Sequence, residues 1–241
     1  MAANPVTSQR LAIVVATIGG LVFAGSLLYF LWSYGWRFDA AVTAGTGAAI
    51  GLDLALFSLF AMHHSVFARS GVKGWIAQRI PAPLERSTYV WIASVLFLVT
   101  CGAWEAVPGL VWHAEGTIRW GLISVQAAAV VFTVYSARRL GLLDLAGLTQ
   151  VLRADASASA PAALDQSGPY ALVRHPIYFG WLLIVWPAPT MNGTRLVFAI
   201  VSTLYLGLAV PFEERDLRRL FGPAYDAYAR RVKWRMVPGL Y

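Results

Sequence analysis

Long stretches of apolar residues dominate this sequence, and the shorter stretches between them contain most of the charged residues. A backbone in lipid must satisfy its own hydrogen bonds, so an apolar stretch of about 20 residues predicts a membrane-spanning helix. Such stretches lie at about 11–32, 43–68, 88–107, 118–137 and 195–212. The pattern therefore predicts an all-α, polytopic membrane helical bundle.

A sixth apolar stretch, from Ile177 to Trp186, is too short to span a membrane by itself. It reaches spanning length only if Arg174 and His175 are included. The segment is therefore either a half-helix or a helix that holds an Arg-His pair below the membrane surface. Ionisable residues at such a depth indicate a functional site. Paired with 195–212 as a hairpin, this segment raises the expected number of membrane crossings to six.

The polar regions between these segments predict loops and surface helices. The stretch 141–170 is expected to be a cytoplasmic loop that can contain a short interfacial helix at 142–152. The segment 195–212 is expected to stop at Glu213. Beyond it, apolar residues recur at three- and four-residue steps among arginines, which predicts an amphipathic surface helix interrupted at Gly222.

Composition and charge placement agree with a membrane protein. Only 13% of the residues are charged, whereas soluble domains contain about 25%. The net charge of +7 could suggest a nucleic-acid partner, but all Lys and Arg except Arg37, Arg119 and Arg195 lie in four regions: the N-terminus, 69–86, 138–174 and the tail from Arg215. Cytoplasmic loops hold an excess of Lys and Arg. The bias therefore predicts cytoplasmic N- and C-termini and no nucleic-acid partner.

Two linked motifs make the last third of the chain recognisable. The first reads Gly168-Pro169-Tyr170-x-x-Val173-Arg174-His175-Pro176-x-Tyr178-x-Gly180, and the second reads Glu213-Glu214-x-x-Leu217-x-x-x-Phe221-Gly222-x-x-Tyr225-x-x-Tyr228. In this order they resemble the signature of the isoprenylcysteine carboxyl methyltransferase and phospholipid methyltransferase superfamily. The resemblance covers residues 168–241. It implies an integral membrane methyltransferase that uses S-adenosyl-L-methionine.

Looser patterns resemble one bacterial branch of that superfamily, the methanethiol S-methyltransferases. They are Ala61-x-His63-His64-Ser65, Pro83-x-Glu85-Arg86-Ser87-Thr88-Tyr89, Asp144-x-x-Gly147-Leu148-x-Gln150 and Trp186-x-x-Pro189-x-Met191. This branch implies a small or lipophilic thiol as the methyl acceptor, with conversion of methanethiol to dimethyl sulfide favoured. It also implies a bacterial inner membrane. We expect a single domain over 1–241, with a four-helix transmembrane part at 11–140 and a cofactor-binding part at 141–241.

The resemblance also assigns roles toward the cofactor, in a cytoplasmic pocket formed by the C-terminal third. Arg174 and His175 suit the carboxylate of S-adenosylmethionine through charge-assisted hydrogen bonds. Glu213 or Glu214 suits its ammonium or ribose hydroxyls, and the ring of Tyr178 can face a cation. The complete expected set is Tyr170, Val173, Arg174, His175, Pro176, Tyr178, Gly180, Glu213 and Glu214. No Gly-x-Gly-x-x-Gly motif follows a strand, so a Rossmann cofactor domain is not expected.

A thiol acceptor must lose its proton, because the thiolate is the nucleophile. His64, His175 or Glu214 could accept this proton, and the sequence does not choose among them. The acceptor is expected to enter near His64, Ser65, Arg86 and Tyr89. Membrane lipid is an expected partner. Four scattered histidines make a metal site unexpected, and the oligomeric state is left open.

Other functions remain open at this point. A prenylcysteine carboxylate or an amine lipid could be the acceptor instead of a small thiol. Sterol reductases contain a similar Arg-His-Pro element and would bind NADPH, although the Glu213-Glu214 motif is closer to the methyltransferases. A non-enzymatic membrane protein is the third alternative. The polar pairs also have structural interpretations: Arg174 and His175 as interfacial anchors, and His63 and His64 as a helix-interface pair.

Overall fold

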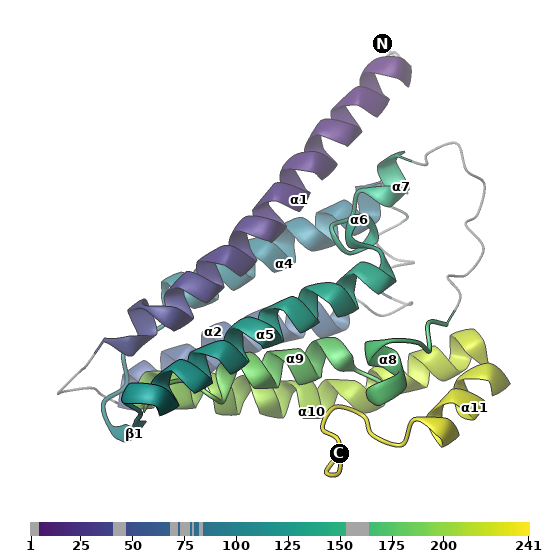
Figure 1. The fold of residues 1–241 in the computed structure, drawn as a ribbon. Coiled ribbons are helices and arrows are strands. Elements are labelled where there is room, and N and C mark those ends of the chain that lie inside the picture. Colours follow the sequence, from purple (N-terminus) through teal and green to yellow (C-terminus); the bar gives the residue numbers. More distant parts are fainter. Residues whose placement is uncertain are drawn as a thin grey trace. The chain divides into compact units, whose positions relative to one another are not determined.

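The computed structural model describes residues 5–40, 47–67, 84–152 and 164–241, together with the single positions 72, 78, 80 and 81. The chain is mostly helical (Figure 1). Its elements are α1 (Pro5–Gly35), η1 (Arg37–Asp39), α2 (Gly47–Val66), α4 (Glu85–Gly102), β1 (Leu110–His113), α5 (Gly116–Leu140), α6 (Leu142–Leu145), α7 (Thr149–Leu152), α8 (Pro169–Leu172), α9 (Pro176–Val185), β2 (Thr190–Asn192), α10 (Gly193–Phe221) and α11 (Pro223–Arg231). The basic residues expected at 69–79 and the small-residue run 154–163 lie outside the described residues.

Four helices among the described residues, α1, α2, α5 and α10, are long and apolar enough to cross a membrane. This confirms the expectation of a helical membrane protein. Helix α4 has 18 residues and begins with Glu85 and Arg86, so its apolar part is shorter than that of the four. Helix α9 has only ten residues, as the short apolar run predicted.

The chain forms two compact units that do not follow its order. The first unit contains Met1–Arg37, Gly47–Glu105 and Gly141–Ser159, and the second contains Phe38–Thr46, Ala106–Leu140 and Ala160–Tyr241. In the first unit α4 packs along both α1 and α2. The indole of Trp91 donates a 3.0 Å hydrogen bond to the carbonyl of Val15, and Gly19 leaves room for that ring. The carboxylate of Asp53 on α2 accepts a 2.8 Å hydrogen bond from the amide of Glu105, just beyond α4.

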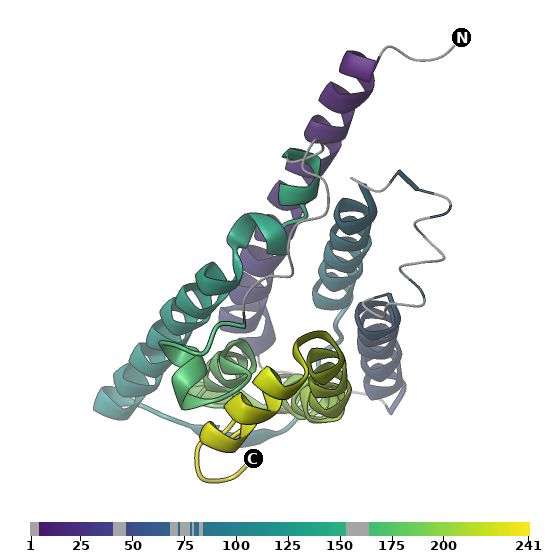
Figure 2. The ribbon, with the colours of Figure 1, turned by 90° about the vertical axis from the view of Figure 1, so that its right-hand side faces the viewer.

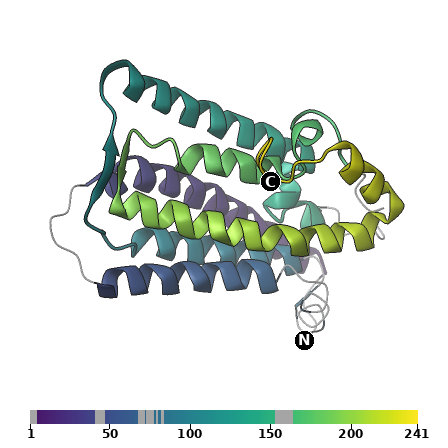
Figure 3. The same cartoon turned by 90° about the horizontal axis from the view of Figure 1, so that it is seen from below.

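Helices α5, α9 and α10 lie side by side in the second unit (Figure 3). Helix α9 packs mainly on α5, where Gly180 faces Thr133. Strands β1 and β2 pair antiparallel and connect the starts of α5 and α10. The side chain of Asn192 caps α10 by accepting a 3.0 Å hydrogen bond from the amide of Arg195. This small ribbon was not expected from the sequence, because neither strand alternates clearly between polar and apolar residues.

The expected end of the last long helix at Glu213 was wrong. Helix α10 continues through Pro211, Glu213 and Glu214 to Phe221. Two features support the extension: Glu214 is surrounded by cationic side chains, and Leu217 and Phe221 pack against a buried cluster of Tyr225, Tyr228 and Val232. The chain then turns at Gly222, whose φ of 54° favours glycine. Helix α11 follows and lies beside α8 (Figure 2).

The expected interfacial helix at 142–152 is two single turns, α6 and α7. Gly147 separates them with a φ of 74°, and its α-carbon lies against the backbone of Ser87. The hydroxyl of Ser87 donates a 2.6 Å hydrogen bond to the carbonyl of Gly147. A continuous helix through this point would remove the close contact with α4.

Gly180 provides a test of the packing between α5 and α9. A Cβ atom at this position would overlap the hydroxyl of Thr133, so Gly180→Ala should lower the free energy of unfolding by about 1–3 kcal/mol. Gly207→Ala is the matched control on α10, because a Cβ there meets no atom within 4 Å. It should leave stability unchanged or raise it by up to about 1 kcal/mol. Thermal unfolding in detergent micelles compares the two variants, and equal stabilities would contradict this packing.

Candidate functional site

The first motif breaks into two helices because of its prolines. Pro169 starts α8 and Pro176 starts α9. A residue before proline is disfavoured in the helical region, so His175, which precedes Pro176, lies outside the helix as the N-cap of α9. The backbone is also extended at Val173, where α8 ends. The amides that this break exposes are bonded by the C-terminal tail. The carbonyl of Trp234 accepts from Arg174, and that of Arg235 accepts from His175 at 2.8 Å.

Arg174 joins three segments of the second unit. Its Nε donates a 2.7 Å hydrogen bond to Oε1 of Glu214 on α10. Its Nη1 donates to the carbonyls of Val232 and Lys233, at 2.7 and 2.9 Å. These contacts use three of the five N–H donors of a guanidinium. Arg174 is thus well placed to hold the tail against α10.

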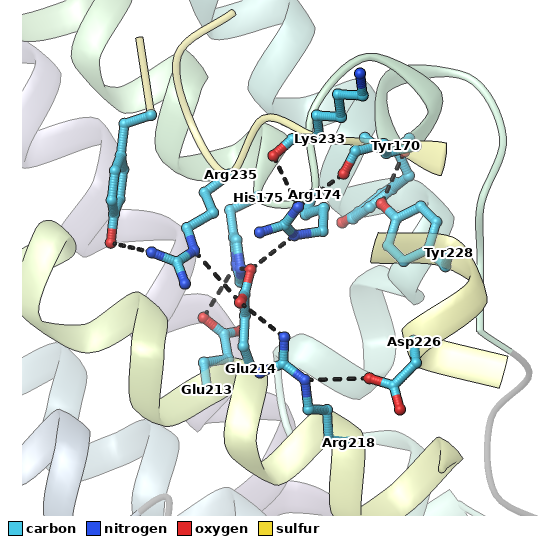
Figure 4. A network of polar contacts seen from close by, with 12 residues as sticks. Tyr170, Arg174, His175, Glu213, Glu214, Arg218, Asp226, Tyr228, Lys233 and Arg235 are labelled. Atoms are coloured by element: carbon cyan, nitrogen blue, oxygen red, sulfur yellow. Dashed lines mark hydrogen bonds and ion pairs between the residues drawn. The ribbon is translucent and has the colours of Figure 1, made fainter. Parts of the chain in front are cut away.

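Glu214 is the centre of this network (Figure 4), and its side chain is 0% exposed. Its Oε1 bonds Arg174, while its Oε2 lies 3.3 Å from Nε of Arg235 and 3.7 Å from Nη2 of Arg218. A buried carboxylate is tolerated only where cations and hydrogen bonds compensate for its lost hydration. In the described part of the chain, three arginines surround this one carboxylate, and one of them, Arg218, also lies 3.3 Å from a carboxylate oxygen of Asp226.

Glu213, one residue earlier, has a different environment. Its side chain is 45% exposed, and its Oε2 accepts a 2.8 Å hydrogen bond from the hydroxyl of Tyr178. The same oxygen lies 3.3 Å from Nδ1 of His175. The rings of His175 and Tyr178 stack with centroids 5.4 Å apart and planes 7° apart. Glu213, His175 and Tyr178 thus form a polar group next to the buried Glu214.

His175 is itself buried. Burial alone would lower the pKa of its imidazole, but hydrogen bonds and charges from Glu213 and Glu214 outweigh that effect and raise the pKa above its ordinary value. Its Nε2 has no hydrogen-bond partner among the described residues and lies 3.6 Å from Oε1 of Glu214. The two neighbouring carboxylates therefore favour the protonated form of the imidazole.

The tyrosines of the two motifs pack the tail helix. The hydroxyl of Tyr228 donates a 2.7 Å hydrogen bond to the carbonyl of Tyr170, which joins α11 to α8. Burial raises the pKa of Tyr228 to about 12. Burial also raises the pKa of Tyr225, whose hydroxyl has no hydrogen-bond partner among the described residues. Both phenols therefore stay protonated at neutral pH and act as packing groups.

The residues expected to serve the methyl acceptor lie in the first unit. The hydroxyl of Tyr89 is 2.8 Å from Nδ1 of His64, so α4 and α2 bring these two side chains together. Ser65 is partly buried on α2. The guanidinium of Arg86 donates to the carbonyl of Asp144 and holds the α6 turn. Of the expected set, His64 and Tyr89 meet each other, whereas Arg86 serves a neighbouring turn.

The sequence interpretation missed two groups. Arg235 contacts Glu214 and also lies over the ring of Tyr241, 5.1 Å from its centroid. An arginine in a short C-terminal tail resembles many other arginines in this chain, so no local signal distinguished it. The second group is His63, which the sequence indicated only as part of a helix-interface pair and which is buried between aromatic rings.

The paired glutamates provide a direct test of this geometry. Glu214→Gln should lower the free energy of unfolding by about 3–5 kcal/mol, because it leaves the buried guanidinium of Arg174 without its carboxylate. Glu213→Gln makes the same chemical change at a half-exposed neighbour and should cost less than about 1 kcal/mol. Chemical unfolding in detergent measures both. Equal losses of stability would show that Glu214 is not the buried partner.

Comparison with known proteins gives several relatives. The chain is 36% identical over 239 residues to methanethiol S-methyltransferase 2 of Bradyrhizobium diazoefficiens, which covers 96% of this chain and 92% of that protein. It is 34% identical to the methanethiol S-methyltransferase of Mycobacterium tuberculosis, with 87% and 91% covered. It is also 32% identical to nurim of Rattus norvegicus, with 72% and 70% covered.

No family model matches the chain, and no solved structure matches it. The similarity to the curated relatives nevertheless extends over almost the whole length, well beyond the two motifs of the last third. Together with the four long apolar helices, it identifies an integral membrane methyltransferase. The chain belongs to the methanethiol S-methyltransferase family, within the isoprenylcysteine methyltransferase-like superfamily.

Proposed function

We propose that this protein transfers the methyl group of S-adenosyl-L-methionine to a small thiol, with methanethiol as acceptor and dimethyl sulfide as product. The observation that carries the donor assignment is the cluster of Arg174, His175, Glu213 and Glu214, which joins both motifs at one end of α10. Relatives named for methanethiol S-methylation, similar along most of the chain, support the acceptor.

The residues present fit the charges of this cofactor. The arginines around Glu214 are charged hydrogen-bond donors of the kind that suits the cofactor's carboxylate. The orphaned Nε2 of buried His175 is a further donor for the same group. Glu213 is half-exposed and anionic, so it suits the ammonium or a ribose hydroxyl better than Glu214, which the arginines neutralise. The ring of Tyr178 stacks on His175 and can face the sulfonium.

The other expected residues act as scaffold in this proposal. Pro176 starts α9 and Val173 is fully buried. Gly180 lets α9 approach α5, and the carbonyl of Tyr170 anchors α11. Their contribution is to fix His175 and Tyr178 opposite Glu213. Such fixed geometry matters because alignment of the reacting groups can supply several kcal/mol of rate enhancement.

When bound, S-adenosylmethionine supplies an electrophilic methyl group, and its leaving group is a neutral thioether. The protein's tasks are then to orient the acceptor, exclude water and accept the thiol proton. Glu214 is a poor proton acceptor, because arginines stabilise its charge. We therefore favour His64 for that role, because the carboxylates beside His175 favour its protonated form. His64, Ser65, Arg86 and Tyr89 form the proposed acceptor region, in which Tyr89 fixes the ring of His64.

We also propose six membrane crossings with both termini in the cytoplasm of a bacterial inner membrane. In the second unit, the cluster around Glu214 lies at the end of α10, whereas the β1–β2 ribbon lies at its start (Figure 3). A cofactor made in the cytosol must reach the cluster from the cytoplasmic side. The arginine-rich end of α5, with Arg138 and Arg139, agrees with that orientation.

Cysteine labelling tests this topology. In a background with Cys101→Ser, single cysteines at Glu115 and Leu240 occupy exposed positions. A membrane-impermeant maleimide added to intact cells should label the Glu115→Cys variant and leave the Leu240→Cys variant unlabelled until the membrane is opened. Trp36→Cys should behave like Glu115→Cys. Labelling of positions 115 and 240 from the same side would refute the proposed topology.

Ligand titration and turnover test the activity. Detergent-purified protein should bind S-adenosylhomocysteine and should convert methanethiol to dimethyl sulfide, measured by headspace gas chromatography. His175→Gln and Glu213→Gln should each weaken S-adenosylhomocysteine binding about ten- to a hundredfold, because each removes a charged hydrogen-bonding group. Glu115→Gln, at an exposed position near the start of α5, is the control and should bind normally.

The same measurements separate the alternatives. Binding of NADPH without S-adenosylhomocysteine would indicate a reductase. Methylation of a prenylcysteine or an amine lipid without methylation of methanethiol would retain the cofactor assignment and overturn the acceptor. Normal binding by both the His175 and Glu213 variants would place the donor elsewhere.

A further inference from the structure

His63 has an unusual environment on the inner face of α2. It is 5% exposed and is one of the buried residues of this helix, together with Asp53 and Phe57. Its ring stacks on Phe67 of the same segment, with centroids 4.5 Å apart, and on Tyr89 of α4, with centroids 5.4 Å apart. The imidazole is therefore held in a flat aromatic slot within the first unit.

Neither ring nitrogen of His63 has a hydrogen-bond partner among the described residues. A neutral imidazole presents one donor and one acceptor, and burial of such groups without partners costs free energy. For packing alone, phenylalanine would serve better at this position, since it stacks equally well and has no polar atoms. A ligand that bonds these nitrogens would explain the presence of a histidine here.

The neighbouring polar groups do not share this property. His64 pairs with the hydroxyl of Tyr89 through its Nδ1. Arg86 is directed to the carbonyl of Asp144. Asp53, also buried on α2, accepts a hydrogen bond from the amide of Glu105 through one oxygen. Among these side chains, His63 is the one whose hydrogen-bonding atoms are all left without a described partner.

We propose that His63 binds the methyl acceptor, a small uncharged thiol. The inference rests on the proposed function and names the binding residue for its acceptor. One ring nitrogen accepts a hydrogen bond from the thiol S–H, and the sulfur lies against the edges of the adjacent aromatic rings, a contact that sulfur favours. Among the residues that the structure describes, none of the contacts of His63 is with a charged group, so a charged acceptor would lack a counter-ion among them.

Nuclear magnetic resonance of histidine-labelled protein tests this binding without the methyl donor. The chain has four histidines, so the ring signals are few, and that of His63 is identified by its loss in His63→Phe. Titration with methanethiol should shift the His63 ring nitrogens and leave those of His113 unchanged. His113 is partly exposed and bonded to Thr190, which makes it a reference within the same molecule.

Kinetics provide the second test. His63→Phe retains the stacking and should raise KM for methanethiol about tenfold, the effect of one lost hydrogen bond, with little change in kcat. His63→Asn keeps a donor and an acceptor and should show a smaller rise. His113→Phe, the same replacement at a partly exposed position, should leave KM unchanged. The thermal unfolding temperature of His63→Phe should be no lower than that of the wild type, because two unsatisfied nitrogens are removed.

The outcomes distinguish this inference from the proposed function. If the wild type methylates methanethiol but His63→Phe has a normal KM, or the thiol leaves the His63 signal unchanged, then His63 does not bind the acceptor. If the wild type binds no S-adenosylhomocysteine and methylates no thiol, the proposed function fails. The thiol titration of His63 can still be read in that case, because it requires no methyl donor.

Discussion

The charge of one buried carboxylate organises the second unit of this protein. Glu214 lies on a helix that is apolar enough to span a membrane, and its side chain has no contact with solvent. Such a charge is stable only beside cations. Arg174, Arg218 and Arg235 supply them from the break before α9, from α10 itself and from the C-terminal tail. The pairing of Glu214 thus requires the first motif, the second motif and the tail to meet.

The pairing of Glu214 with Arg174 also fixes the position of the short helix α9, which begins two residues after Arg174. The prolines of the first motif stop regular helix before His175 and expose backbone amides at Arg174 and His175. The tail bonds those amides and is in turn bonded by the guanidinium of Arg174. Met236 then packs with Leu206 and Val210 of α10. The polar cluster and the apolar contacts below it therefore stabilise the same arrangement.

Adjacent residues with the same chemistry have opposite environments in both units. Glu214 is buried among arginines, whereas Glu213 is half-exposed and bonded to Tyr178. His64 bonds Tyr89, whereas His63 is stacked between rings without a described hydrogen-bond partner. Consecutive helical positions differ by about 100° around the axis, so the two members of each pair meet different surroundings. In both pairs one member is buried and the other is at least partly exposed.

The sequence by itself determined that this protein lies in a membrane and where its main helices run. It also determined which polar residues the last third contains. A helix can span lipid only if its apolar stretch is long enough, and that length can be read from consecutive residues. The polar residues of the two motifs can likewise be read directly from the sequence. Tertiary structure alone decided that α10 continues past Glu213 and which glutamate is buried. It also decided that Arg235 contacts Glu214 and that His63 stacks between aromatic rings. Those features depend on helix rotation and on the path of the tail across α10. They arise from contacts between residues about 20 to 60 positions apart, for which the local pattern contains no signal.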